Sequence, residues 1–258
     1  MEKKVIAFLR VSIPAYNDDI IKNNKLYMNA QTFFHSMELT DGQADEAEGM
    51  VSLMPLQLRW STNEGKDWSK DSLEIQSLSY NPHAYVFCVY AIFSDSLVYD
   101  NENEVYTYIV PWSYIKDFWK PDTENEMLIT PYVSVFSEKF DYAAEKSGFF
   151  HTRAFVQYDL DERLHDPKYI QMVNNDGLTV VFHKKRKHSK ENEYRFSILN
   201  PNKPQHYELF LEGTKDIYYR IPLKENYSVQ LAFQGLIFDE NKELIQYSPQ
   251  IGARFIKA

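Results

Sequence analysis

Short apolar runs, separated by polar segments, recur along the chain and predict a protein rich in β-strands. The runs combine valine, isoleucine, tyrosine and phenylalanine, the residue types that favour strands. A further short strand is predicted to begin at Leu26. The last two-thirds of the chain is therefore expected to be dominated by strands, at residues 5–11, 84–92, 105–110, 150–158, 178–183, 194–199, 207–211, 217–221 and 229–238.

Fewer segments have helical spacing. Residues 14–24 begin with a proline, which the first turn of a helix tolerates. Residues 112–119 carry an apolar stripe at helical spacing and end before Pro121, so we expect a helix that packs its stripe into the core. The stripe consists of Trp112, Ile115, Phe118 and Trp119. Short helices are also predicted at 141–146 and 164–173, and residues 41–48 are compatible with a loop or a solvent-facing helix.

Length and composition indicate one folded unit. The chain has 258 residues, of which 44% are hydrophobic and 25% charged, and this is the make-up of a globular protein. No repeat, low-complexity tract or linker marks a boundary. We therefore expect a single domain over residues 1–258, of the α+β class, with a curved, mostly antiparallel sheet and a few short helices.

The rarest residue types exclude several classes of site. No two of the 8 glycines are spaced as G-x-G and none opens a G-x-x-x-x-G-K run, which excludes Rossmann and P-loop phosphate sites. No G-x-S-x-G, H-E-x-x-H or kinase motif is present. The single cysteine, Cys88, can form neither an internal disulfide nor a cysteine-rich zinc site. We assign no metal. No apolar run is long enough to span a membrane, so a cytoplasmic protein is expected.

The net charge of −9 argues against a general nucleic-acid-binding surface. One basic segment, residues 183–190, nevertheless gathers five lysine and arginine residues between two predicted strands. It is interpreted either as a solvated hairpin loop or as a contact for a nucleic-acid acceptor, made through Lys184, Lys185, Arg186 and Lys187. In both cases we expect the segment to be exposed and mobile, with its two histidines solvated.

Three segments carry side chains that could bind a ligand together. Arg10 interrupts an apolar strand and needs an anionic partner if it points inward. A second segment, residues 26–34, places aromatic rings beside the amide of Asn29, which suits the stacking of a planar heterocycle. A third places Glu191 and Glu193 two residues apart, and therefore on one face of a strand.

Each segment also has a purely structural explanation. Arg10 would pair with a buried carboxylate, and the aromatic residues would pack in the core. Glu191 and Glu193 would form charge pairs with Lys184, Lys185 or Arg195 across a hairpin, where an exposed pair contributes about 0–1 kcal/mol. Cys88 would be a small buried hydrophobic residue without a nucleophilic role.

In chain order, the three segments resemble the layout of ADP-ribosyltransferases. Residues 26–34, the acidic residues 45–49, the apolar strand at 86–90 and the motif Glu191-x-Glu193-Tyr194-Arg195 more closely resemble an uncharacterised, defence-associated group of bacterial proteins. The fold of that group is similar to that of ADP-ribosyltransferases. This chain lacks the Ser-Thr-Ser triplet of the better-defined members, so the class of acceptor stays open.

The resemblance implies an enzyme that uses NAD as its substrate. Cleavage of the nicotinamide–ribose bond passes through an oxocarbenium-like state, which a carboxylate stabilises. The implied catalytic residues are Glu193 and, towards the acceptor, Glu191. The implied NAD-binding residues are Arg10 for the ribose or phosphate and Tyr27 for the nicotinamide, together with Asn29 and Phe33. We therefore expect Arg10, Tyr27 and Glu193 to line one pocket.

Two functions follow as alternatives. The first is an NAD-dependent ADP-ribosyltransferase that acts as the toxic effector of a phage-defence or toxin–antitoxin system, modifies a protein or nucleic-acid acceptor, and is restrained by an antitoxin or regulatory protein. For this function, Glu193→Gln should abolish NAD consumption and change stability little. The second is a non-enzymatic interaction module, a sensor or an inhibitor, on the same fold.

Overall fold

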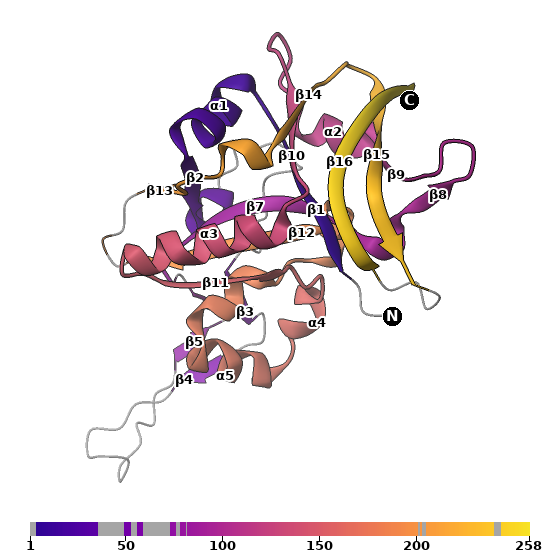
Figure 1. The fold of residues 1–258 in the computed structure, drawn as a ribbon. Helices are drawn as coiled ribbons and strands as arrows, with labels where there is room; N and C mark the ends of the chain where they lie inside the picture. Colours follow the sequence, from indigo (N-terminus) through magenta and orange to yellow (C-terminus); the bar gives the residue numbers. More distant parts are fainter. Residues whose placement is uncertain are drawn as a thin grey trace.

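The computed structural model describes residues 4–35, 49–52, 56–58, 73–75, 78–80, 82–200, 202, 205–239 and 244–258. Its centre is an eight-stranded sheet (Figure 1). Six strands follow the order β11 (Phe150–Phe155), β12 (Glu193–Leu199), β7 (Ala84–Phe93), β1 (Val5–Ser12), β10 (Glu126–Thr130) and β14 (Tyr219–Pro222). The other two are β2 (Lys25–Ala30), which pairs with β7, and β13 (His206–Phe210), which pairs with β2.

The central strand β7 shares one of its edges between two neighbours. β1 pairs with the end of β7, where Leu9 lies opposite Tyr90, and β2 pairs with its beginning, where Asn29 lies opposite Val86. On the other edge, β12 runs along most of β7 and places Glu193 opposite Tyr90. Leu9, Tyr90 and Glu193 therefore lie in one row across three strands.

A second sheet of four strands lies beside the first. Its order is β16 (Leu244–Lys257), β15 (Tyr227–Phe238), β9 (Val105–Val110) and β8 (Val98–Asp100). Two small pairs join β3 (Met50–Ser52) to β6 (Leu78–Ser79) and β4 (Leu56–Leu58) to β5 (Leu73–Ile75). All of these strand pairs are antiparallel, as the sequence predicted.

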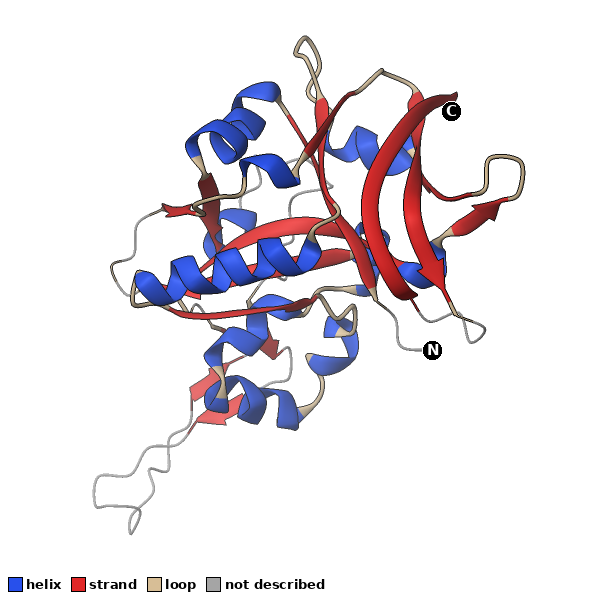
Figure 2. Ribbon diagram, viewed as in Figure 1, coloured by secondary structure: helices blue, strands red, loops and turns tan. Residues whose placement is uncertain are grey.

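The helices are short, except for α3, and lie around the main sheet (Figure 2). The α-helices are α1 (Pro14–Asn23), α2 (Trp112–Phe118), α3 (Val133–Lys146), α4 (Leu160–Arg163) and α5 (Pro167–Asn175). The 3₁₀ helices are η1 (Gln31–His35), η2 (Ser94–Ser96), η3 (Gly177–Phe182), η4 (Arg186–Glu191) and η5 (Lys215–Ile217). Over the part of the chain that the structure describes, no helix has the length and apolarity needed to cross a membrane.

Three apolar clusters hold these layers together, on the two faces of the main sheet. On the first face, a cluster around Phe196 joins the sheet to α1 and α3. On the second face, a cluster around Tyr90 joins it to the four-stranded sheet and α2. A third cluster, around Val86 on the same face, joins the sheet to α5 and η3. The second face is thus covered by two layers: the four-stranded sheet with α2, and α5 with η3. These two layers meet near Tyr90 and Cys88.

Most predicted elements are confirmed, but several differ, and some strands were not predicted. The main-sheet strand β10 and the long strand β16 were not expected from the sequence. Residues 178–183 are a 3₁₀ helix and not a strand, and α3 begins at Val133, eight residues before the predicted start at 141. The helix predicted at 164–173 begins later, as α5 at Pro167, and the short helix α4, which ends at Arg163, was not predicted. Residues 41–48 lie outside the described part of the chain.

Candidate functional site

A cluster of buried charges lies on the second face of the main sheet, where its two covering layers meet. Glu193, at the start of β12, is only 6% exposed, and its carboxylate contacts two cations. Arg195 Nε donates a hydrogen bond to Oε1 at 2.7 Å, and Lys184 Nζ lies 2.8 Å from Oε2. Lys184 also contacts Glu191 Oε2 at 2.7 Å, and His188 Nδ1 lies 2.7 Å from Glu191 Oε1. We call Lys184, His188, Glu191, Glu193 and Arg195 the charge cluster.

The cluster is anchored by groups from several elements. The Glu193 N–H donates to the hydroxyl of Tyr158 at 2.8 Å, and a guanidinium N–H of Arg195 donates to the Val181 carbonyl in η3. The ring of Phe34, in η1, lies 5.8 Å from the Arg195 guanidinium carbon. Asn192 donates to the hydroxyl of Tyr90 at 3.2 Å. Hydrogen bonds and a ring contact from other elements therefore hold β12 in place around the charge cluster.

The electrostatics of the cluster keep Glu193 ionised. Burial alone would raise the pKa of its carboxyl, but Arg195 and Lys184 together lower that pKa well below its usual range. The thiol of Cys88 lies on the same face of the sheet, opposite Arg195 in the register. Burial raises the pKa of this thiol, and the nearby Glu193 carboxylate raises it further, so the thiol stays protonated and is a poor nucleophile.

The sequence predicted the partners of Glu193 but not its burial. Lys184 and Arg195 were among the cations expected to pair with the two glutamates. Glu193 is buried, and not exposed as its charge pairs were expected to be, because η3 packs against β12 and both oxygens of the Glu193 carboxylate contact Arg195 and Lys184. The consequence for stability also changes: removal of this buried carboxylate while its two cationic partners stay in place leaves uncompensated buried charge and is strongly destabilising.

Arg10 and Glu193 do not share a face of the sheet. Leu9 and Glu193 both lie opposite Tyr90, so their side chains point to the same side, and Arg10 follows Leu9 and alternates to the other side. Arg10 is half-buried where β1 leaves β7, with its guanidinium carbon 4.9 Å from the centre of the Phe87 ring. Burial there lowers the pKa of Arg10.

The expected common pocket of Arg10, Tyr27 and Glu193 is therefore wrong. Arg10 lines a cavity of about 20 Å³ together with apolar residues of the first face, and neither Tyr27 nor Glu193 lines it. A volume of this size holds about one water molecule and not a dinucleotide.

The other expected NAD-binding residues lie on β2 and η1. Tyr27 and Asn29 alternate to the same face of the sheet as Glu193, since Asn29 lies opposite Val86. Tyr27 is exposed, and its ring stacks on His206 at 4.7 Å. Phe33 is also exposed and makes an edge-to-face contact with Phe34. Tyr27 and Phe33 are therefore exposed at the surface. The purely structural explanation, in which they pack in the core, is wrong for these two residues.

The basic segment is not the exposed hairpin loop that the sequence predicted. Lys184 is buried in the charge cluster and is not available to a nucleic acid. Arg186 and Lys187 are exposed, but the Arg186 guanidinium pairs with Glu162, and the backbone N–H of Arg186 donates a hydrogen bond to the Asp161 carboxylate at 3.0 Å. Lys185 is half-buried. The acidic neighbours in α4 offset part of the positive charge, which weakens the case for a phosphate contact.

The two histidines of the segment are buried, in contrast to the expectation that they would be solvated. His183 Nδ1 lies 2.6 Å from Asp159 Oδ1, and the His183 ring meets the Tyr169 ring edge-to-face. Arg163 donates to the other oxygen of Asp159 at 2.8 Å. Neither Asp159 nor Tyr158 was singled out from the sequence. Both lie just after β11, where a change from apolar to polar residues was the only available signal.

Burial of His183 makes stability depend on pH. Burial lowers the pKa of His183 more than Asp159 raises it, so the folded protein binds this proton less readily than the unfolded chain. We expect the free energy of unfolding to fall as the pH drops below about 6.5, with a slope of at most about 1.4 kcal/mol per pH unit from this group. Urea unfolding across pH 7.5–5.5 measures this slope.

The matched variants are His183→Gln and His165→Gln. Glutamine cannot titrate, so His183→Gln should lose part of the slope, whereas His165→Gln should keep it because His165 is exposed. Equal slopes in the wild type and His183→Gln would show that His183 does not carry the effect.

Comparisons with protein-family models, with curated proteins and with solved structures find no match to this chain. Among the described residues, no group of three or more histidine, cysteine, aspartate or glutamate side chains is arranged to hold a metal ion. The interpretation of the site therefore depends on its own geometry.

Proposed function

We propose that this chain acts by binding another protein, as a sensor or an inhibitor, and not by consuming NAD. The observation that carries the proposal is the state of Glu193: both oxygens of its buried carboxylate contact cations of the same chain. A carboxylate that stabilises an oxocarbenium-like state has to face the substrate ribose. In this protein it faces Lys184 and Arg195, an arrangement that supports a structural role.

The surface provides further support for an interaction module. Several large aromatic side chains are exposed, including Tyr27, Phe33, Tyr142 and Phe210. Aromatic residues are enriched at protein interfaces, where they bury a large area at a small cost in conformational entropy. They lie on or next to β2 and β13, the side branch of the main sheet, and at the C-terminal half of α3.

One specific observation favours ADP-ribosyl transfer as the second candidate. The Glu193 carboxylate is held ionised, as that reaction requires, and Tyr27 and Asn29 lie on the same face of the sheet. For this candidate the ion pairs of Glu193 have to open before NAD binds, since the carboxylate is otherwise occupied. Because Arg10 lies on the other face of the sheet, a different basic residue, on the face of Glu193, would have to bind the ribose or phosphate of NAD.

The two candidates differ in what they predict for NAD. We expect the wild-type protein to release no nicotinamide from NAD above the rate of a buffer blank, and to transfer no label from biotinylated NAD to the components of a bacterial lysate. Nicotinamide release measured by chromatography and a streptavidin blot provide the two readouts.

Tyr27→Ala is the informative variant, because Glu193→Gln is expected to impair folding. Tyr27 is exposed, so its replacement should leave the melting temperature nearly unchanged. The interaction proposal would be overturned if the wild type labels lysate components and Tyr27→Ala reduces this labelling at least about tenfold at an unchanged melting temperature. That result would establish NAD chemistry.

A further inference from the structure

β13 has a free outer edge in the described part of the chain. It pairs with β2 alone, and the described strands include no partner for its other side. Ala30 N–H donates to the Gln205 carbonyl and Leu211 N–H to the Asn24 carbonyl. These bonds show that the odd-numbered residues of β13 are the ones that hydrogen-bond to β2. Tyr207 and Leu209 therefore point their backbone groups towards β2, and His206, Glu208 and Phe210 point theirs outwards. An edge of this kind is a template for another strand.

A groove runs along this free edge. It has a volume of about 240 Å³ and lies between β13 and the C-terminal half of α3. Four consecutive residues of β13, 207–210, line it, and because strand side chains alternate between faces, the groove follows the edge of the strand and not one face. Its wall on α3 includes Tyr142, which is 60% exposed, and its wall on β13 includes Phe210, which is 54% exposed.

The side chains along the edge define what it can accept. Phe210 and Glu208 lie on the same face of β13, two residues apart, so an added strand would place an apolar and a basic residue opposite them. The residue between those two would point into the groove beside Tyr142, where an apolar side chain fits. Glu212, at the end of the groove, is 76% exposed and forms an ion pair of 3.4 Å with Lys146. Glu208, whose side chain is 39% exposed, forms an ion pair of 3.2 Å with Lys25 on β2. Glu208 and Glu212 thus each have one lysine partner within the chain, but both stay partly exposed, so a basic residue of a ligand can also contact them.

A second copy of this chain fits less well. Antiparallel pairing of two β13 edges that uses all three outward residues places Glu208 opposite Glu208 of the other copy. Like charges directly opposite each other destabilise a strand pair.

We infer that the outer edge of β13 binds an extended segment of a partner protein, which adds a strand to the main sheet and carries the consecutive pattern apolar, apolar, basic. The backbone of β13 supplies the hydrogen bonds, the groove beside α3 takes the central apolar side chain, and Glu208 selects the basic residue. This inference rests on the proposed interaction function and names the surface and the class of ligand.

The experiment uses a fluorescein-labelled peptide with valine, valine and lysine at its centre, flanked by threonines. We expect the wild-type protein to bind it about three- to fivefold more tightly than the same peptide with glutamate in place of lysine, measured by fluorescence anisotropy. Glu208→Lys should reverse the preference. Glu225→Lys, a matched change in the turn between β14 and β15, should leave it unchanged.

Amide hydrogen exchange locates the site. On addition of the peptide, the amides of His206, Glu208 and Phe210 should gain protection, whereas Tyr207 and Leu209, which already bond to β2, should stay as they were. No binding at millimolar peptide, or protection elsewhere, overturns the inference. So does a wild-type dimer in which the three outward amides are already protected, because the edge then pairs with a second copy.

The two proposals can fail separately. A negative peptide experiment, together with no NAD consumption, rejects this surface and leaves the interaction function in place. NAD consumption that depends on Tyr27 rejects the interaction function, whatever the peptide does.

Discussion

Glu193→Gln should lower the free energy of unfolding by about 3–5 kcal/mol, because it leaves two buried cations without their shared counter-ion. Arg195 is fully buried and Lys184 nearly so, so neither can regain its hydration without local unfolding. Glutamine keeps the shape of the side chain but not the charge. Urea unfolding at pH 7, followed by circular dichroism, measures the loss.

Two controls separate the buried charge from other causes. Glu162→Gln removes one partner of an exposed ion pair with Arg186 and should cost less than about 1 kcal/mol. Replacement of Lys184, Glu193 and Arg195 together by apolar residues of similar volume should restore much of the stability lost in Glu193→Gln. A loss in Glu193→Gln no larger than that in Glu162→Gln would contradict the buried ion pairs.

The same cluster has a defined dependence on pH. The pKa of Glu193 is lower in the folded protein than in the unfolded chain, so its contribution to stability is complete above the unfolded pKa of about 4.3 and decreases as the pH falls below it. The loss in stability between neutral pH and strongly acidic pH should therefore be smaller in Glu193→Gln than in the wild type.

Phe196→Ala should cost about 3–5 kcal/mol, because it opens a cavity at the centre of the first face. Phe196 is fully buried in β12, and its ring contacts the rings of Phe8, Phe136 and Phe140 at centroid distances of 5.5, 5.0 and 5.0 Å. These residues come from β1 and α3, so the cavity would lie between the sheet and its longest helix.

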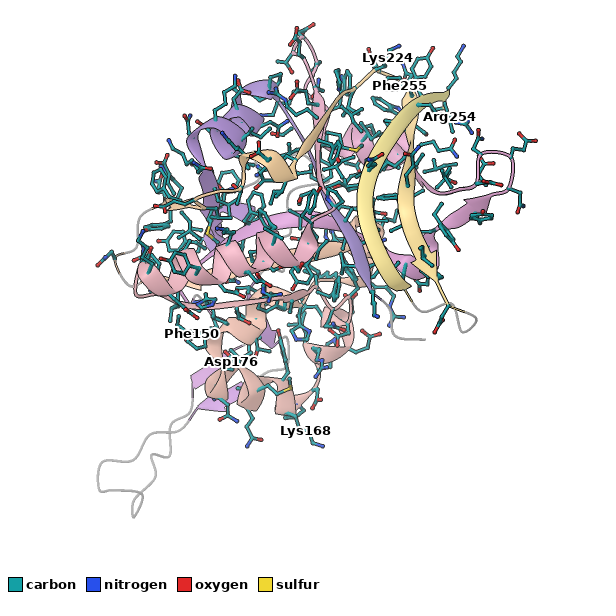
Figure 3. All side chains as sticks on the ribbon, viewed as in Figure 1. Phe150, Lys168, Asp176, Lys224, Arg254 and Phe255 are labelled. Carbon is teal, nitrogen blue, oxygen red and sulfur yellow. The ribbon has the colours of Figure 1, made fainter. Side chains whose placement is uncertain are left out.

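Phe150→Ala is the matched control. Phe150 lies on the neighbouring strand β11, at the edge of the main sheet (Figure 3), and is 63% exposed. Its truncation should change the free energy of unfolding by less than about 1 kcal/mol. Similar losses from the two variants would mean that β12 is not packed as described.

Most strands of the main sheet and the helices α1 and α2 could be predicted from local pattern, whereas β10, β16 and the layers that cover the sheet could not. The start of α3 was missed because Val133 and Val135 favour strands by local preference, and only packing against Phe8 and Phe196 makes that segment helical. Residues 178–183 are an apolar run that fits a buried strand or a buried helix equally well. In the structure, Asp176 accepts a hydrogen bond from the Leu178 N–H and starts a 3₁₀ helix.

The candidate site shows the same division. Opposite charges at Lys184, Glu193 and Arg195 are visible in the sequence, and so is their proximity along the chain. Their burial depends on η3, which contacts β12 through the Val181 carbonyl and is itself packed against α5 by long-range contacts. The face that Arg10 occupies depends on the register of β1 against β7, and a shift of one residue would have reversed it.

The charge cluster also determines which pairings of β12 are tolerable. A slip of one residue along β7 would turn Glu193 and Arg195 towards the rings of Phe8 and Phe136, and Tyr194 and Phe196 towards Lys184. Two charges would then lie in an apolar core, and Lys184 would lose one of its two carboxylate partners. The same slip in an all-apolar strand would cost far less free energy. The buried ions therefore disfavour misaligned pairing of β7 and β12 during folding, two strands that lie about one hundred residues apart in the chain and whose pairing requires a slow, long-range loop closure.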